Sequence, residues 1–195
     1  MSSLGPFDEL ILASTSSARR ALMEGLGLPF RAVAPGVDEI VPEGTLAHYA
    51  VAMLAERKAR AVTERFPRAL VIGSDQLVAL GDQTLGKPEN ASAARQQLGS
   101  LRGKTHEIHT GLTVIGPSFI ATEVDTARLT VLLLSDLELD GYVATNEWQG
   151  CAGGYRVEAR GQAIFERIEG DRAAIQGLPM QRLTRLLREA GVQFF

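Results

Sequence analysis

The segment ALVIGSDQLVAL, residues 69–80, is a strongly apolar run broken only at its centre, by Gly73, Ser74, Asp75 and Gln76. Such a run is typical of a buried strand. A carboxylate inside a buried strand is costly unless it is paired or binds a metal, so Asp75 is a candidate general base or metal ligand. The alternative is a bulge or strand edge at which Asp75 simply faces solvent, and it stays open at this point.

Strand and helix patterns alternate on both sides of this segment, which predicts an α/β fold with helices flanking a mixed, twisted sheet. Further strands are expected at residues 9–13, 30–34, 106–115, 122–134, 155–157 and 163–168, and helices at residues 45–65, 90–101, 135–145 and 179–190, besides a short helix that ends near Leu26. A turn opening with Gly116 and Pro117 predicts a hairpin from the runs at 106–115 and 122–134. No repeat or Gly/Ser linker interrupts the chain, so we treat residues 1–195 as a single domain.

The composition narrows the classes of partner. The 195 residues are 45% apolar and 22% charged, as is ordinary for a globular domain. A net charge of −3 gives no electrostatic footprint for a nucleic-acid polymer and favours a small anionic ligand. The single cysteine, Cys151, excludes an intrachain disulfide and a multi-cysteine zinc site. Acidic Asp8 and Glu9 precede only a short apolar run, and no run reaches the roughly 20 apolar residues of a membrane span, so we expect a cytoplasmic protein.

Residues 14–20, STSSARR, lie where the first strand is predicted to lead into a helix. Helix N-termini expose unpaired N–H groups and partial positive charge, so Arg19 and Arg20 are unfavourable there unless an anion compensates. Hydroxyl, N–H and guanidinium groups together suit a phosphate. The alternative interpretation is a serine cap followed by two solvated arginines.

Two lysines, Lys58 and Lys87, lie in segments that allow more than one interpretation. Lys58 lies on the apolar stripe of the helix at 45–65, where it either extends outward to solvent or reaches into a polar site. Residues 81–88, GDQTLGKP, nearly match a P-loop, but Pro88 stands where that loop needs a Ser or Thr to bind Mg²⁺. We interpret residues 81–83 as a hairpin turn and Lys87 as a lone cation beyond it. His48, His106 and His109 form no metal-binding pattern, and no covalent nucleophile is indicated.

These segments together resemble the Maf family of nucleoside triphosphate pyrophosphatases over nearly the whole chain. The residues that carry the resemblance are, in chain order, Ser14-Thr15-Ser16 with Arg19-Arg20, Val37-Asp38-Glu39, Lys58, Gly73-Ser74-Asp75-Gln76, Gly86-Lys87-Pro88, Gly103-Lys104-Thr105-His106-Glu107 with Thr110-Gly111, and Gly177-Leu178-Pro179. One such motif is a weak signal, whereas the ordered set is specific.

The resemblance implies a fold related to the inosine triphosphate pyrophosphatases, with two lobes around a cleft, frequent homodimers and dependence on Mg²⁺ or Mn²⁺. It implies hydrolysis of a nucleoside triphosphate to the monophosphate and pyrophosphate, with Asp75 as the catalytic base. By the same carry-over, the triphosphate is bound by Ser14, Arg19, Arg20, Lys58 and Lys87. Glu39 would join Asp75 in binding the metal.

Within that family, substrate choice follows three positions, Ala18, Gln76 and Glu158. Gln76 and Glu158 are similar to the branch that acts on 7-methyl-GTP, whereas the dTTP and UTP branch usually has Thr and Gln there. The Glu158 carboxylate suits guanine, which offers N1–H and N2–H donors and carries positive charge once methylated. Ala18 departs from both branches, because the first often has an aromatic residue and the second an arginine, and alanine cannot stack on a base.

Two alternatives accompany this expectation. One is the same chemistry directed at dTTP, UTP or CTP. The other is a non-catalytic, nucleotide-sensing protein linked to cell division. Turnover of a nucleotide panel separates them, because a sensor binds a nucleotide without hydrolysing it.

Overall fold

The computed structural model describes residues 3–195, which fold into two compact units. The first unit contains the chain up to Gln76 together with Thr110–Asp125 and Arg172–Phe195, and the second contains Leu77–His109 and Thr126–Asp171. The chain crosses between the units within three of its long strands. The cleft implied by the resemblance, and the assignment of residues 1–195 to one domain, stay predictions.

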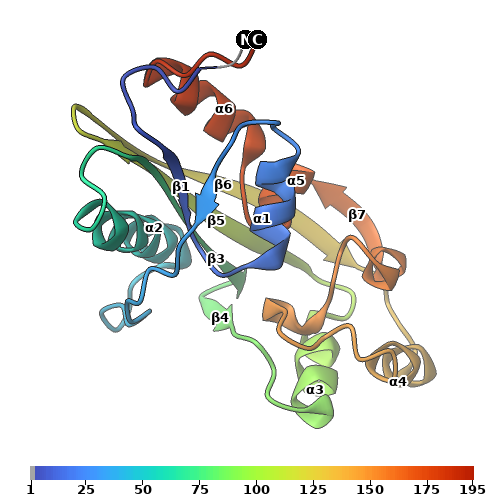
Figure 1. Ribbon diagram of the computed structural model, residues 1–195. Helices are drawn as coiled ribbons and strands as arrows, with labels where there is room; N and C mark the ends of the chain where they lie inside the picture. Colours follow the sequence, from blue (N-terminus) through green and yellow to red (C-terminus); the bar gives the residue numbers. More distant parts are fainter. Residues whose placement is uncertain (1–2) are drawn as a thin grey trace. The chain divides into compact units, whose positions relative to one another are not determined.

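Seven strands form one mixed sheet in the order β2-β1-β3-β5-β6-β7, with β4 paired to β3 (Figure 1). The strands are β1 Leu10–Ala13, β2 Arg31–Ala32, β3 Leu70–Leu80, β4 Gln83–Leu85, β5 Thr105–Gly116, β6 Phe119–Val131 and β7 Phe165–Glu169. The helices are α1 Ser17–Glu24, α2 Ala47–Thr63, α3 Ala91–Leu101, α4 Asp136–Val143, α5 Arg172–Ile175 and α6 Met180–Glu189, with 3₁₀ helices η1 Ala152–Gly154 and η2 Arg160–Ile164. β1 is parallel to β2 and β3, whereas β4 is antiparallel to β3 and β7 to β6. The predicted α/β class with a mixed sheet is confirmed.

Most predicted elements are present, and their ends follow local side-chain chemistry. Asn90 caps α3, because its Oδ1 accepts a hydrogen bond from the Ala93 N–H at 2.9 Å. Ser135 starts α4 with a capping box that it shares with Glu138. Gly81 takes a positive φ of 59° in the turn between β3 and β4, as the hairpin interpretation of residues 81–83 requires.

The strand predicted at residues 155–157 is wrong. Gly153 and Gly154 each take a φ of 77°, and the chain bends there through η1 instead of extending. The Tyr155 ring is buried, and its hydroxyl lies 2.5 Å from His106 Nε2. This segment is therefore held by a side-chain contact and not by pairing with a strand. The contact with His106 cannot be predicted from the strand-like residues at 155–157 alone.

Within the first unit β1, β3 and β5 are buried on both faces, so alternate side chains enter different cores. Leu70 and Ile72 of β3 belong to a cluster that includes residues of α1 and α6. Val71 packs in a second cluster with Ala59 and Val62 of α2. Leu70 and Ile72 of β3 therefore face α1 and α6, and Val71 between them faces α2. Figure 1 shows α2 on one side of the sheet and α1 and α6 on the other.

Two glycines let α2 approach this sheet closely. A Cβ atom at Gly73 would lie 2.2 Å from the carbonyl oxygen of Ala55, and one at Gly111 would lie 2.2 Å from that of Val51. No side chain fits such a gap, so glycine is required at both positions. The alternation along β3, continued past Gly73, then directs Asp75 toward α2.

In the second unit, ion pairs link α3 and the residue that follows it to α4. Arg95 Nε lies 2.6 Å from Asp140 Oδ1, and Arg102 also pairs with Asp136. The Asp136 and Asp140 carboxylates are exposed and the two arginines are partly exposed, so each pair stabilises the unit only slightly. No helix within residues 3–195 is both long and apolar enough to span a membrane.

Candidate functional site

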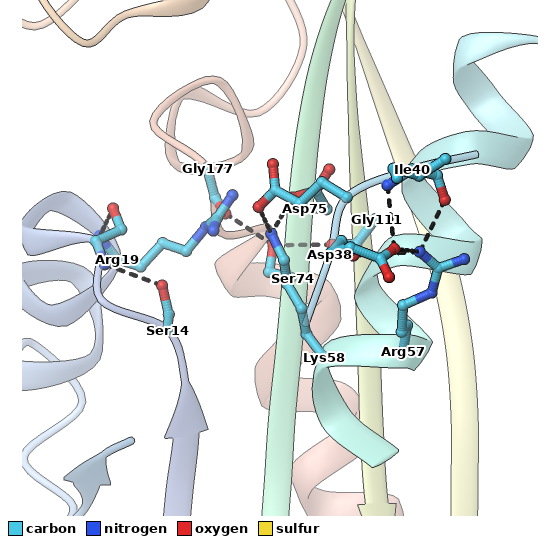
Figure 2. Close-up of polar contacts among 12 residues, drawn as sticks. Ser14, Arg19, Asp38, Ile40, Arg57, Lys58, Ser74, Asp75, Gly111 and Gly177 are labelled. Atoms are coloured by element: carbon cyan, nitrogen blue, oxygen red, sulfur yellow. Dashed lines mark hydrogen bonds and ion pairs between the residues drawn. The ribbon is translucent and has the colours of Figure 1, made fainter. Parts of the chain in front are cut away.

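Asp75 of β3 and Lys58 of α2 form a buried ion pair (Figure 2). Each side chain is only 8% exposed. Asp75 therefore does not face solvent, and Lys58 does not extend outward from its helix. The structure therefore selects the alternative in which both residues belong to a polar site inside the first unit.

Lys58 also reaches a second carboxylate. Its Nζ donates to Glu39 Oε1 at 2.6 Å, and the Glu39 side chain is 64% exposed. The neighbouring Arg57 fixes the segment that carries Glu39, because its Nη1 donates to Asp38 Oδ1 at 2.6 Å and to the Ile40 carbonyl oxygen at 2.8 Å (Figure 2). One buried and one exposed carboxylate thus converge on a single ammonium group.

Arg19 is held at the start of α1 near the end of β1. Ser16 caps the helix by accepting from the Arg19 N–H at 3.3 Å, and Ser14 Oγ accepts from the Ser16 N–H at 3.1 Å. The Arg19 Nε donates to the Gly177 carbonyl oxygen at 2.7 Å. The serine hydroxyl groups therefore shape the helix start, and the guanidinium is anchored to a distant part of the chain.

Arg19 also lies within electrostatic range of both carboxylates. Burial lowers the pKa of the Arg19 guanidinium, and attraction to Asp75 and Glu39 acts in the opposite direction. The first unit thus brings two cations, Arg19 and Lys58, together with two carboxylates. Such a cluster can bind an anion and accept a proton beside it.

The residues on either side of Asp75 hold this site together from the other face of β3. Ser74 Oγ lies 2.9 Å from the Gly177 carbonyl oxygen and 2.8 Å from that of Gly111. Gln76 Nε2 lies 2.8 Å from the Ala174 carbonyl oxygen. The Gly177 carbonyl oxygen therefore accepts from both Arg19 and Ser74.

The other predicted site residues are placed less completely. Arg20 is exposed on α1, and Ala18 is half-buried there. Lys87 and Glu158 are exposed residues of the second unit, and Glu158 lies 3.6 Å from Arg156. Their positions relative to Asp75 are not determined, so their roles stay predictions.

Sequence reasoning missed Arg57 and the function of the Gly177 carbonyl group. The only signal for Arg57 was its place next to Lys58 in the sequence. Gly177 was part of the family resemblance, but a backbone carbonyl carries no side-chain pattern that would indicate its partners. Both contacts depend on residues far apart in the chain.

A divalent metal fits the carboxylates of this site. Glu39 and Asp75 both reach one point, the Lys58 Nζ, and Mg²⁺ is commonly bound by one or two carboxylates together with substrate phosphates. Within residues 3–195 there is no cluster of three or more His, Cys, Asp or Glu side chains suited to a metal.

Comparisons with known proteins bear on this site. Residues 9–190 match the family model described as Maf-like protein. The 7-methyl-GTP pyrophosphatase of Xanthomonas axonopodis pv. citri is 41% identical over 185 residues, covering 94% of this chain and 97% of the relative. The dTTP/UTP pyrophosphatase of Deinococcus radiodurans is 41% identical over 190 residues, covering 95% of each chain.

One solved structure, that of the Staphylococcus aureus Ham1 protein, is similar with a TM-score of 0.45 and 14% identity, covering 65% of this chain and 73% of that one. This likeness is weak, and the α/β fold described above rests on the strands and helices themselves.

Proposed function

Because the chain belongs to the Maf family, we propose that it hydrolyses a nucleoside triphosphate to the nucleoside monophosphate and pyrophosphate. The observation that carries the proposal is the buried pair of Asp75 and Lys58, with Arg19 within electrostatic range. Attack of water on phosphorus needs a proton acceptor beside groups that attract the phosphates. This cluster supplies both.

In the proposed reaction the oxygen of a water molecule bonds to the α-phosphorus while Asp75 takes one of the water protons. The bond between the α-phosphorus and the bridging oxygen breaks, and its electron pair leaves with pyrophosphate. The triphosphate is bound by Ser14, Arg19, Arg20, Lys58 and Lys87. Their positive charges and hydrogen bonds offset the negative charge that builds on the leaving group.

Glu39 and Asp75 would hold Mg²⁺ or Mn²⁺. When bound, such an ion polarises the phosphate oxygens as a Lewis acid. Arg57 supports this role from the protein side, because it anchors the segment that carries Glu39. Lys58 contacts both carboxylates and also offers a positive charge to the phosphates.

For the base we propose 7-methyl-GTP. Gln76 and Glu158 are the residues by which this chain resembles the 7-methyl-GTP branch. Relatives bearing that name include the protein of Nitrosococcus oceani, 41% identical over 190 residues. The dTTP/UTP pyrophosphatase of Deinococcus radiodurans is as similar in identity, so the same chemistry on dTTP or UTP is the second candidate. Ala18 provides no ring to stack on either base.

We further propose a cytoplasmic setting, no binding of nucleic-acid polymers and a homodimer. The net charge of −3 supports the proposal that the protein binds no nucleic-acid polymer, because such a polyanion binds to a basic surface. Size-exclusion chromatography with light scattering measures the oligomeric state, and a monomer at all concentrations contradicts the homodimer.

The test of function is a nucleotide panel with Mg²⁺ or Mn²⁺, in which pyrophosphate and orthophosphate are measured separately. Pyrophosphate from 7-methyl-GTP at a higher kcat/KM than from dTTP supports the proposal. Hydrolysis in ¹⁸O-labelled water identifies the phosphorus atom that water attacks, because label in the monophosphate indicates attack at the α-phosphorus. Release of orthophosphate contradicts that assignment, and binding without turnover indicates a nucleotide sensor.

A further inference from the structure

The Lys58 ammonium group lies between the two carboxylates that are proposed to hold the metal. Its Nζ donates to Glu39 Oε1 at 2.6 Å and to the Asp75 carboxylate. The Lys58 side chain is only 8% exposed, so the ammonium has exchanged water for these two acceptors. The protein thus supplies a cation of its own to the point at which both carboxylates meet.

This ammonium and a divalent metal compete for the same oxygens. Mg²⁺ binds carboxylate oxygens directly, as the Lys58 ammonium already does. The Glu39 side chain is 64% exposed, so the site can be reached from solvent. Two cations on one pair of carboxylates would repel one another strongly at so short a range, because water is largely excluded beside Asp75. The pair can therefore hold the ammonium or the metal, and not both.

Arg57 precedes Lys58 in α2 but is fixed to the backbone (Figure 2). Its Nη1 donates to the carbonyl oxygens of Asp38 at 3.2 Å and Ile40 at 2.8 Å. These contacts hold both neighbours of Glu39 without the help of Lys58. Lys58 differs, because its ammonium lies on a flexible four-carbon stem and bonds to side-chain carboxylates. The segment that carries Glu39 can thus stay in place when Lys58 turns away from it.

We propose that Lys58 is a stand-in cation, which occupies the carboxylates of Glu39 and Asp75 in the free protein and turns to the phosphates when a divalent metal enters with the nucleotide. This inference rests on the proposed function and adds an order to it. The free protein binds a divalent metal weakly, because Lys58 holds the site. Phosphates that attract Lys58 open the carboxylates, so the phosphates and the metal each favour binding of the other.

The first test measures binding of Mn²⁺ without any nucleotide, by electron paramagnetic resonance of the free ion. Lys58→Gln removes the positive charge and keeps two N–H donors for the carboxylates. We expect the Kd for Mn²⁺ to fall roughly tenfold relative to the parent, as for two ligands that exclude one another. A lysine that only binds phosphate has no such effect, so an unchanged or higher Kd would overturn the inference.

Two further variants locate the effect. Arg60→Met removes a positive charge from the exposed face of α2, and it should change the Kd for Mn²⁺ by less than about twofold. An equal gain in this control would mean a general effect of charge. In a Lys58→Gln background, Glu39→Gln should abolish the gain, because the site then lacks one carboxylate. A gain that survives this change would place Mn²⁺ elsewhere and contradict the inference.

The second test uses inorganic tripolyphosphate, which has the phosphates but no base. With Mg²⁺ at saturation, calorimetry should show tripolyphosphate binding weakened roughly tenfold in Lys58→Gln, because the ammonium that turns to the phosphates is missing. One substitution should thus tighten the binding of metal and weaken that of phosphate. Unchanged tripolyphosphate binding would contradict the second half of the proposal.

Urea denaturation provides another measurement if Lys58→Gln does not fold without metal. At one Mn²⁺ concentration the urea midpoint should rise more for Lys58→Gln than for the parent, because tighter binding to the folded state stabilises it more. A variant that is unfolded without metal should fold as Mn²⁺ is added. Equal shifts in the two proteins, or no recovery of folding with Mn²⁺, would contradict the inference.

Failure of this inference is distinguishable from failure of the proposed function. A parent protein that releases no pyrophosphate from any nucleotide contradicts the function. The comparison of Mn²⁺ binding between the parent and Lys58→Gln involves no turnover, so its result decides the role of Lys58 in either case.

Discussion

Lys58 and Asp75 pair across the interface between α2 and β3, with both side chains nearly removed from solvent. Neither charge would be stable there alone, because a buried ion without a partner loses its hydration without compensation. The contact exists because Gly73 has no side chain to hold α2 away from the strand. The same pair therefore contributes to folding and forms the centre of the proposed site.

Replacing Lys58 with methionine should destabilise the protein, since it leaves the Asp75 carboxylate buried and unpaired. We expect the free energy of unfolding, measured by urea denaturation, to fall by about 3–5 kcal/mol. The double variant Lys58→Met with Asp75→Asn should recover much of this loss. Arg60→Met, which breaks an exposed pair with Glu56, is the control and should cost about 0.5 kcal/mol or less. If Lys58→Met and Arg60→Met lowered the free energy of unfolding equally, the buried pair would be contradicted.

Gly73→Ala should force α2 away from β3. The new Cβ would lie 2.2 Å from the Ala55 carbonyl oxygen, so the helix must shift and carry Lys58 with it. We expect unfolding free energy to fall by about 1–3 kcal/mol, together with a loss of turnover. Gly99→Ala in α3 meets no atom within 4 Å and should instead stabilise its helix by about 0.5–1 kcal/mol. A Gly73 variant as stable and active as the parent would rule out this packing account.

Glu39→Gln should weaken binding of the divalent metal while leaving the fold intact. The Glu39 side chain is 64% exposed, so its pair with Lys58 contributes little to stability. We expect the Mg²⁺ concentration for half-maximal activity to rise roughly tenfold, with turnover at saturating metal largely kept. The exposed Glu43→Gln is the matched control. If the titration curves of the Glu39 variant and the parent coincide, Glu39 has no role in metal binding.

Stability should fall with acidification because of His106. Burial lowers the pKa of His106 to about 4 from its ordinary value of 6.5. Between these values the unfolded chain binds a proton that the folded protein does not, so this contribution is complete above pH 6.5 and is lost as the pH falls toward 4. The loss from pH 7.5 to pH 5 should be about 2 kcal/mol. His106→Gln should remove it, whereas the exposed His48→Gln should not; identical pH profiles for all three proteins would contradict the assignment.

The fold could be predicted largely from local patterns. Asn90 and Ser135 act as caps within one turn of their own helices, so a single sequence reveals them. The nearly continuous apolar run at residues 69–80 likewise predicts a buried strand. The segment after Gly153 could not be predicted, because its conformation depends on Tyr155 meeting His106, a residue of β5.

The candidate site was predictable as a set of residues and not as a geometry. Asp75 and Lys58 stood out because charged groups in apolar surroundings require a partner. Arg19 stood out because a cation at the start of a helix is unfavourable without an anion. Their partners come from segments distant in sequence: Lys58 from α2 meets β3, and Arg19 from α1 meets Gly177. Neither pairing follows from spacing along the chain, since each depends on how the helices pack on the sheet.

The central claim is that Asp75 accepts the proton of the attacking water, and turnover of Asp75→Asn tests it most directly. The amide keeps the shape of the side chain but cannot serve as the base. With the proposed substrate at saturation, kcat for pyrophosphate release should fall by roughly 10² or more, with tripolyphosphate binding largely retained. Asp82→Asn, an exposed change in the turn after β3, should leave kcat unchanged. Near-normal pyrophosphate release by the Asp75→Asn variant would contradict the account.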